Sequence, residues 1–203
     1  MKEKYAAHMP FVDGVVFDFG GVMSHFPKED WPIYPLCEKV GLSREALDRG
    51  MSAHRHEYDA DFVNCEGLYR ILLKENNLPV PPPEWFREVY LADSRGWRRP
   101  DEATLGLMKE CKAAGKKIGI LTNMSVEFFN DYFVPVFRCF RELADAEVVS
   151  GFEHLYKPLR PIYDLMAERI GIPAERLLFL DDTERNIVAA RSFGWRGEVF
   201  TGA

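Results

Sequence analysis

The sequence has no long hydrophobic run and few cysteines. No stretch of its 203 residues approaches the roughly 18–20 consecutive apolar residues of a membrane span, and Pro10 and Asp13 interrupt any apolar core at the N-terminus. The four cysteines are widely spaced and form no CxxC pair, which argues against a zinc site or a disulfide framework; they are Cys37, Cys65, Cys111 and Cys139. We therefore expect a cytoplasmic protein with no membrane partner.

An excess of positive charge is also missing. Lysine and arginine number 26 against 32 aspartates and glutamates, so the net charge is −6 at pH 7. This balance gives no electrostatic reason to expect a nucleic-acid partner. Internal repeats and low-complexity segments are absent as well. The chain is long enough for one core that carries a large insertion.

Buried strands alternate with helices over most of the chain. The run Val15–Phe17 predicts a strand buried on both faces, and it leads into Asp18, Gly20 and Gly21. Further strands are expected at 117–123, 146–150, 176–182 and 197–200, and helices at 101–114, 125–140, 161–170 and 184–193. The helix over 125–140 is expected despite Pro135. This alternation predicts an α/β fold with a parallel sheet and right-handed crossovers.

The stretch 26–99 interrupts the α/β pattern. Its apolar residues recur at helical spacings, Ser43 is a suitable N-cap, and Pro83 can open a helix at its first turn. No buried strand is evident here. We predict a helical insert of roughly 75 residues.

Polar side chains follow three of the predicted strands: Asp18, then Thr122 and Asn123, then Asp181 and Asp182. The ends of parallel strands share one edge of a sheet, so these groups can converge. Carboxylates about 4 Å apart repel by roughly 4 kcal/mol at an effective dielectric near 20, which calls for a compensating cation. An oxygen-rich site suits Mg²⁺, and Lys157 is placed to assist. Capping of the next helix could explain one of the aspartates, but not all four positions in this order.

The order D-F-G-G-V, then L-T-N, then K-P, then L-D-D resembles the four motifs of the haloacid dehalogenase-like (HAD) hydrolase superfamily. The resemblance covers all of the chain except the insert. It implies a Rossmann-like parallel sheet core, residues 1–24 and 100–203, with an inserted helical cap of the C1 type, residues 25–99. The D-F-G-G-V variant resembles a subgroup that contains sugar-phosphate phosphatases.

The resemblance also implies roles for the motif residues. Asp18 would be the nucleophile that forms an aspartyl-phosphate, and Lys157 would neutralise nucleophile and phosphate. Phosphate binding would fall to Thr122, Asn123 and Gly21. The Mg²⁺ ligands would be Asp18, the carbonyl of Gly20, Asp181 and Asp182. The implied activity is Mg²⁺-dependent hydrolysis of a small phosphorylated metabolite, a sugar phosphate or a nucleotide.

Gly20 departs from the pattern of the family's phosphatases, which carry a second aspartate there to protonate the leaving oxygen. General acid catalysis typically contributes about 10²–10⁴-fold, so the loss matters. His25 is a candidate substitute acid. Two alternatives stay open: a carbon–halogen hydrolase that uses the same Asp18, and a member without catalysis that binds a ligand or partner.

The insert is expected to choose the substrate. A polar cluster could face the cleft or simply be solvated; it consists of His54, Arg55, His56, Tyr58, Asp59 and Asp61. Trp85 and Trp97 are expected to pack within the cap. Arg98 and Arg99 could contact phosphate or form a surface hinge. The sequence names neither the substrate nor the oligomeric state.

Overall fold

The structure, a computed structural model, describes residues 2–26, 30–97 and 99–203, so Arg98 lies outside the described residues. Its centre is a five-stranded parallel sheet in the order β3-β2-β1-β4-β5. The strands are β1 (Gly14–Phe17), β2 (Lys117–Thr122), β3 (Ala146–Val149), β4 (Leu177–Asp181) and β5 (Arg196–Val199). The α/β fold with a parallel sheet is thereby confirmed.

Neighbouring residues of a strand point to opposite sides of the sheet, and in the central strands both sides are buried. In β4, Leu178 and Leu180 belong to one apolar cluster, whereas Leu177 and Phe179 belong to the other. The first cluster lies under α1 (Glu3–Ala6), η1 (Met9–Phe11), α6 (Glu102–Ala113) and the helical segment 126–141; the second lies under α11 (Arg160–Ile170) and α12 (Glu184–Ser192). Short helices α10 (Ser150–Glu153) and η4 (Ala174–Arg176) complete the connections.

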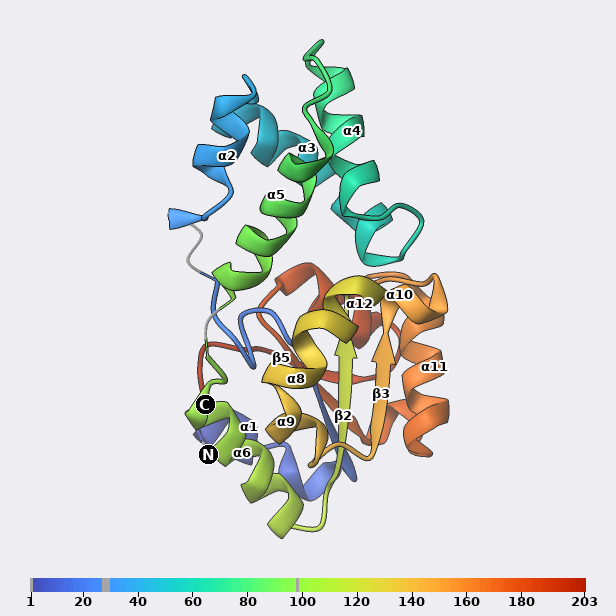
Figure 1. Ribbon diagram of the computed structural model, residues 1–203. Coiled ribbons are helices and arrows are strands. Elements are labelled where there is room, and N and C mark those ends of the chain that lie inside the picture. Colours follow the sequence, from blue (N-terminus) through green and yellow to red (C-terminus); the bar gives the residue numbers. More distant parts are fainter. Residues whose placement is uncertain (1, 27–29, 98) are drawn as a thin grey trace.

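Between β1 and α6 the described part of the chain forms four α-helices, which we call the cap helices. They are α2 (Tyr34–Lys39), α3 (Arg44–Asp59), α4 (Cys65–Glu75) and α5 (Pro83–Gly96). Ser43 caps α3 by accepting a hydrogen bond from the Ala46 amide at 3.2 Å, and Pro83 opens α5, as predicted. The cap helices bury their apolar faces against one another in a cluster of their own, and they stand over the carboxyl edge of the sheet (Figure 1).

The segment 125–140 is helical, as predicted, but it is not one regular α-helix. The segment consists of α7 (Val126–Phe128), a π-helical turn η3 (Phe129–Phe133), α8 (Val134–Val136) and α9 (Arg138–Arg141), with a break at Phe137. Pro135 supplies no amide hydrogen, and its ring conflicts with the carbonyl one turn earlier. A wider π turn before the proline and a bend after it accommodate both effects.

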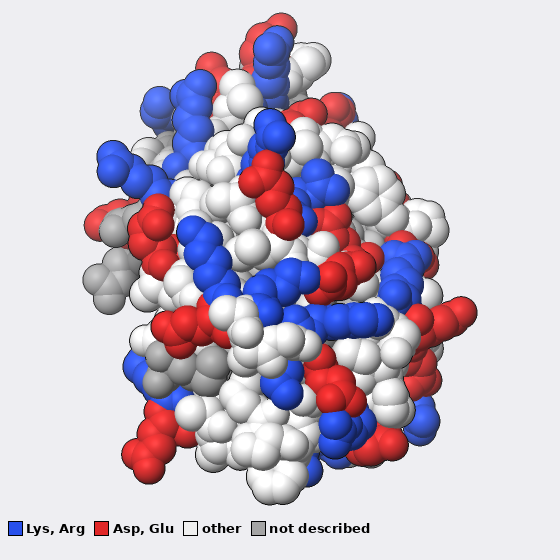
Figure 2. Space-filling model, turned by 90° about the horizontal axis from the view of Figure 1, so that it is seen from below, with Lys and Arg blue, Asp and Glu red and all other residues white. Residues whose placement is uncertain are grey.

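Acidic and basic side chains are intermingled on the face opposite the cap helices (Figure 2). None of the helices in the described parts of the chain is long and apolar enough to cross a bilayer.

Candidate active site

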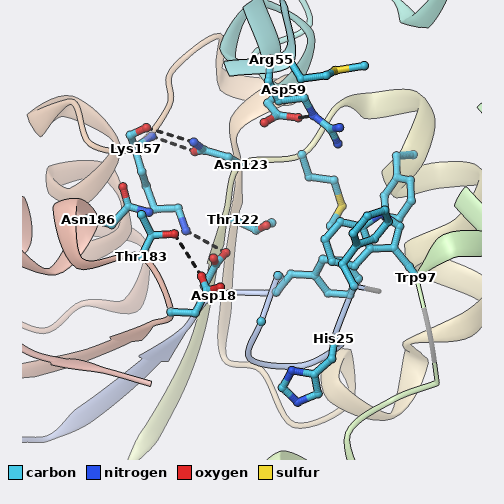
Figure 3. Close-up of a pocket in the computed structure, with 18 of the residues that line it drawn as sticks. Asp18, His25, Arg55, Asp59, Trp97, Thr122, Asn123, Lys157, Thr183 and Asn186 are labelled. Carbon is cyan, nitrogen blue, oxygen red and sulfur yellow. Dashed lines mark hydrogen bonds and ion pairs between the residues drawn. The ribbon is translucent and has the colours of Figure 1, made fainter. Parts of the chain in front are cut away.

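The strand ends at the carboxyl edge of the sheet converge on a cavity of about 970 Å³ between the sheet and the cap helices. Asp18 follows β1, Thr122 ends β2, and Asp182 follows β4; all three line this cavity. Figure 3 shows that Lys157, carried by the loop before α11, reaches in from the side. The predicted convergence of the polar strand ends is therefore present.

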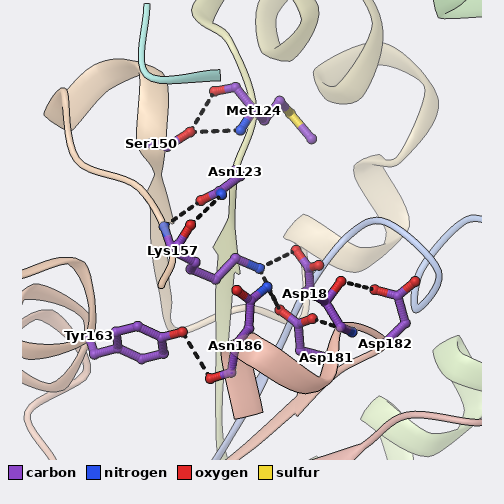
Figure 4. A network of polar contacts seen from close by, with 10 residues as sticks. Asp18, Asn123, Met124, Ser150, Lys157, Tyr163, Asp181, Asp182 and Asn186 are labelled. Carbon is purple, nitrogen blue, oxygen red and sulfur yellow. Dashed lines mark hydrogen bonds and ion pairs between the residues drawn. The ribbon is translucent and has the colours of Figure 1, made fainter. Parts of the chain in front are cut away.

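Lys157 joins two of the carboxylates. Its Nζ lies 2.8 Å from Asp18 Oδ1 and 2.7 Å from Asp181 Oδ2 (Figure 4). Lys157 is 2% exposed and Asp181 is fully buried, so these ion pairs are shielded from water. Oxygens of Asp18, Asp181 and Asp182 lie within 4.8 Å of one another. One ammonium group thus pairs with two carboxylates of a group of three.

Asp181 is occupied by protein donors. Besides Lys157, its Oδ2 accepts a hydrogen bond from Asn186 Nδ2 at 3.0 Å, and its Oδ1 accepts one from the Thr183 amide at 2.8 Å. The Tyr163 hydroxyl in turn donates to the Asn186 carbonyl at 3.0 Å. Asp181 thus holds both Lys157 and the main chain of Thr183, but it does not cap α12, because the N-cap residue is Thr183 and no side chain makes a capping hydrogen bond there.

The charges in the cluster shift each other's protonation. Burial raises the pKa of Asp18 to about 7; Lys157 opposes this rise, whereas Asp181 adds to it. Burial lowers the pKa of Lys157, but the adjoining Asp18 and Asp181 carboxylates outweigh it and the pKa is raised overall. The pKa of Asp182 is also raised, by burial and by Asp181. The cluster carries more negative charge than Lys157 neutralises, which is the condition under which a cation binds.

Asn123 fixes the position of Lys157 through its side-chain amide. Its Oδ1 accepts a hydrogen bond from the Lys157 amide at 2.8 Å, and its Nδ2 donates to the Lys157 carbonyl at 3.0 Å. Both ends of the side chain are therefore engaged. Thr122 and Asn123, at the end of β2, are the two residues predicted here to bind phosphate. The side chain of Asn123 is engaged, so only its main chain is available. The Thr122 hydroxyl makes no hydrogen bond to another described residue and is available.

The two glycines after Asp18 belong to a tight turn. The Gly21 amide donates to the Ser24 carbonyl at 2.8 Å, and the Met23 amide donates to the Phe19 carbonyl at 2.8 Å. Gly21 has φ +66°, and a Cβ there would lie 2.1 Å from Asp182 Oδ2. The turn therefore approaches Asp182 so closely that only glycine fits.

Gly21→Ala is expected to lower the free energy of unfolding by more than Gly115→Ala. Both glycines have positive φ, but Gly115 has nothing within 4 Å of its Cβ position. The left-handed conformation alone costs a non-glycine residue roughly 1–2 kcal/mol, and only Gly21→Ala adds the displacement of Asp182. Denaturant unfolding of both variants checks this, and equal losses would contradict the close approach.

His25 lines the same cavity, but its ring points away from Asp18 in Figure 3. The ring Nε2 lies 3.2 Å from Asp101 Oδ2, and the side chain is 53% exposed. A role as proton donor would require the ring to leave Asp101. This role stays a prediction.

The predicted polar cluster of the insert divides in two. Tyr58 lines the cavity together with Arg55 and Asp59, the two that Figure 3 labels, whereas His54 pairs with Glu57 and Glu75 outside it. The other two members, His56 and Asp61, are not among the lining residues either.

Arg55 also has a partner that the sequence did not reveal, Asp93 on α5. Arg55 Nε lies 2.9 Å from Asp59, its Nη1 lies 3.7 Å from Asp93, and Asp93 accepts a hydrogen bond from the Trp31 indole at 2.9 Å. Burial raises the pKa of Asp93 against the influence of Arg55. No local periodicity links α3 with α5, so only the packing of the cap helices could reveal this partner.

The two tryptophans differ in position. Trp85 is buried in the cap cluster, as predicted, and its indole donates to the Leu36 carbonyl at 3.0 Å. Trp97 instead lines the cavity and packs on Phe19 of the core, with ring centroids 5.0 Å apart. Arg99 is exposed beyond it.

Two curated proteins share part of the sequence. The sesquiterpene phosphatase astK of Aspergillus oryzae is 28% identical over 102 residues, which cover 50% of this chain and 51% of that protein. The phosphatase MT3486 of Mycobacterium tuberculosis is 26% identical over 193 residues, which cover 91% of this chain and 85% of that protein. The chain thus spans about half the length of the first relative and most of the second.

Solved structures with the same fold include an HAD family enzyme, bt-2542, from Bacteroides thetaiotaomicron, with a TM-score of 0.73, 15% identity and 93% of each chain covered. That enzyme was also solved in complex with magnesium and inorganic phosphate. L-2-haloacid dehalogenase from Xanthobacter autotrophicus has a TM-score of 0.65 and 17% identity over 92% of this chain and 76% of that one. The sequence model of haloacid dehalogenase-like hydrolases matches residues 12–194. The chain belongs to the haloacid dehalogenase-like hydrolase family.

Proposed function

We propose that the protein is a Mg²⁺-dependent hydrolase of a small phosphomonoester and that Asp18 is its nucleophile. The observation that carries the proposal is the Asp18–Lys157–Asp181 arrangement beside Asp182, in which a single lysine pairs with two of three neighbouring carboxylates. Both curated relatives are named phosphatases, which supports the same activity. The division into a core, residues 1–24 and 100–203, and a cap, residues 25–99, is part of the proposal.

The cluster fits Mg²⁺ in its donor set. All of its candidate ligands are oxygens, and Mg²⁺ is held in proteins by one or two carboxylates with waters and substrate phosphate. Asp18 and Asp182 have the oxygens least engaged by protein donors, and the Gly20 carbonyl would complete the set. Asp181 would act from behind them, since its oxygens already accept three hydrogen bonds. When bound, the ion would neutralise oxygens of the nucleophile and the phosphate.

In the proposed reaction an Asp18 carboxylate oxygen attacks phosphorus while the bond from phosphorus to the ester oxygen breaks. The alcohol leaves, and its oxygen takes up a proton. Water then attacks the same phosphorus, the bond to Asp18 breaks, and inorganic phosphate departs from the regenerated carboxylate. Carboxylates serve as nucleophiles in this way when a neighbouring charge positions them.

The remaining residues act on charge and position. Lys157 holds Asp18 Oδ1 at 2.8 Å and offsets the charge that gathers on the phosphoryl oxygens. The Thr122 hydroxyl, together with the main-chain amides near Asn123 and Gly21, would hold those oxygens. His25 stays the sequence-based candidate for the proton donor, because Gly20 has no side chain to serve.

Carbon–halogen hydrolysis is the second candidate, because the fold is also that of L-2-haloacid dehalogenase. Dehalogenases of the family need no metal, and the acidic pair Asp181–Asp182 is therefore an argument for the phosphatase. A third possibility is that the protein binds a ligand without catalysis. This would hold if the lack of an acidic side chain at position 20 had abolished hydrolysis.

Purified protein is expected to release inorganic phosphate from at least one phosphomonoester with Mg²⁺, and EDTA is expected to stop the release. A screen of sugar phosphates, nucleotides and simple phosphate esters checks this. Halide release that persists in EDTA would instead support the dehalogenase. Release of neither product would support binding without catalysis.

A further inference from the structure

The cavity has two chemically different sides. Figure 3 shows Asp18, Lys157 and their polar partners on one side and a group of aromatic and sulfur-containing side chains on the other. The aromatic side is formed mainly by Phe19, Phe26, Trp31, Met51, Trp97 and Phe128. At about 970 Å³ the cavity is much larger than a phosphate group, so most of a bound ester would lie against this apolar side.

Trp97 takes up the space beside Gly20. A Cβ at position 20 would lie 3.4 Å from the outer edge of the Trp97 indole. A longer side chain there would have to displace the indole or turn away from it. The apolar surface thus extends to the second residue after the nucleophile, where a leaving group must pass.

The indole is held firmly in this place. Its ring centroid lies 5.0 Å from that of Phe19 and 4.9 Å from that of Phe26. The Tyr132 hydroxyl donates to the Trp97 carbonyl at 2.7 Å. These contacts come from the core, from the segment after β1 and from η3, so the ring is a fixed part of the cavity.

The charged groups of the cap helices that face the cavity are engaged with each other. Arg55 lies between Asp59 and Asp93, and Asp93 also accepts the hydrogen bond of the Trp31 indole. The Tyr34 hydroxyl donates to Asp48 at 3.0 Å. A leaving group rich in hydroxyls would leave some of them without hydrogen-bond partners on the aromatic side, which disfavours its binding.

We propose that the substrate is the phosphate ester of an apolar alcohol, and that Trp97 is the residue that selects the apolar leaving group. The proposal rests on the phosphatase activity proposed above. An apolar group that covers the Trp97 ring gains binding free energy in proportion to the apolar area that it removes from water. A sugar of the same shape gains much less and loses hydrogen bonds to water.

Cyclohexylmethyl phosphate and glucose 6-phosphate form a matched pair of substrates, because both join a six-membered ring to the phosphate through one CH₂ group. The wild-type enzyme is expected to prefer the cyclohexyl ester by about 10-fold or more in kcat/KM, as one or two kcal/mol of differential binding implies. Trp97→Ala is expected to remove most of this preference, mainly through KM for the cyclohexyl ester, and Trp97→Phe to retain most of it. Trp85→Phe, outside the cavity, is the control and leaves the ratio unchanged.

Equal or better hydrolysis of glucose 6-phosphate by the wild type would overturn the proposal, and so would an unchanged ratio in Trp97→Ala. If neither ester is hydrolysed, the phosphate-release screen still tests the proposed activity, and the preference for the apolar group is measured by binding. Calorimetry with the two corresponding phosphonates, which cannot be hydrolysed, then decides this inference by itself. Tighter binding of the cyclohexyl compound, lost in Trp97→Ala, supports the inference, and equal binding contradicts it.

Discussion

Asp18→Asn is expected to lower kcat for phosphomonoester hydrolysis by roughly 10⁴-fold or more, the scale on which enzymes lose activity with their nucleophile. An amide oxygen is a poor nucleophile, and the variant also has one negative charge fewer for binding a cation. The fold is expected to survive, because asparagine has nearly the shape of aspartate. Steady-state kinetics with the best substrate of the phosphate screen measures the loss.

The same variant is expected to be more stable than the wild type without metal. Burial raises the pKa of Asp18 from 3.8 to about 7, so the folded state binds a proton more tightly than the unfolded state does. The stability due to protonated Asp18 is present in full below pH 3.8 and is lost as the pH rises through about 7. Asp18→Asn removes this loss. About three pKa units correspond to about 4 kcal/mol at pH 8, so the melting temperature is expected to rise by roughly 10 °C, at about 2–4 °C per kcal/mol.

Asp164→Asn is the matched control, because Asp164 is an exposed carboxylate paired only with Arg160 at 3.2 Å. It is expected to change neither the turnover nor the slope of melting temperature against pH. Turnover that persists in Asp18→Asn would remove Asp18 from the reaction. If the melting temperature of Asp18→Asn changes with pH as that of the wild type does, the burial of Asp18 is not the cause of this pH dependence.

Lys157→Met is expected to reduce both activity and stability. The loss of the ammonium group leaves Asp18 and the fully buried Asp181 without their shared counter-charge. Removal of one partner from a buried ion pair costs about 3–5 kcal/mol, and loss of one group that stabilises transition-state charge lowers kcat by about 10²–10³-fold. Denaturant unfolding and steady-state kinetics measure the two losses.

The instability of Lys157→Met is expected to depend on pH. Without the lysine the pKa of Asp18 rises further, so Asp18 is protonated as the pH falls from 8 to 6. The difference in the free energy of unfolding between the wild type and Lys157→Met is therefore expected to become smaller over this range. Lys112→Met is the control, since Lys112 pairs with Asp145 at 2.7 Å near the surface and such pairs contribute about 0–1 kcal/mol. A similar cost in both variants, or a deficit independent of pH, would contradict the role of the buried pairs.

The central strands were predictable because they are short apolar runs buried on both faces, as in Val15–Phe17 and β4. The helical character of the insert was predictable for a similar reason, from its periodic spacing and its Ser43 cap. The π-helical turn and the break within the helical segment 125–140 were not predictable, because the response of a helix to Pro135 depends on the packing around it. The sequence shows the proline but not whether a π turn can form before it.

In the site, the order of polar strand ends was enough to predict that Asp18, Thr122 and Asp182 meet at one cavity. The sequence could not show how their neighbours are used. The side chain of Asn123 makes both of its hydrogen bonds to the main chain of Lys157, and the Asp181 carboxylate accepts hydrogen bonds from three donors. The approach of Trp97 to Gly20 joins positions 77 residues apart through a packing contact that no local pattern encodes.

Detection of a phosphoryl group bound covalently to Asp18 is the most direct test of the proposed mechanism. The reaction is quenched with acid during turnover, the protein is digested, and mass spectrometry locates any added phosphoryl group; reduction with borohydride marks the same aspartate as homoserine. The mechanism predicts one phosphoryl group on the peptide that contains Asp18, absent from Asp18→Asn. A phosphoryl group on another residue, or full turnover with none on Asp18, would contradict it.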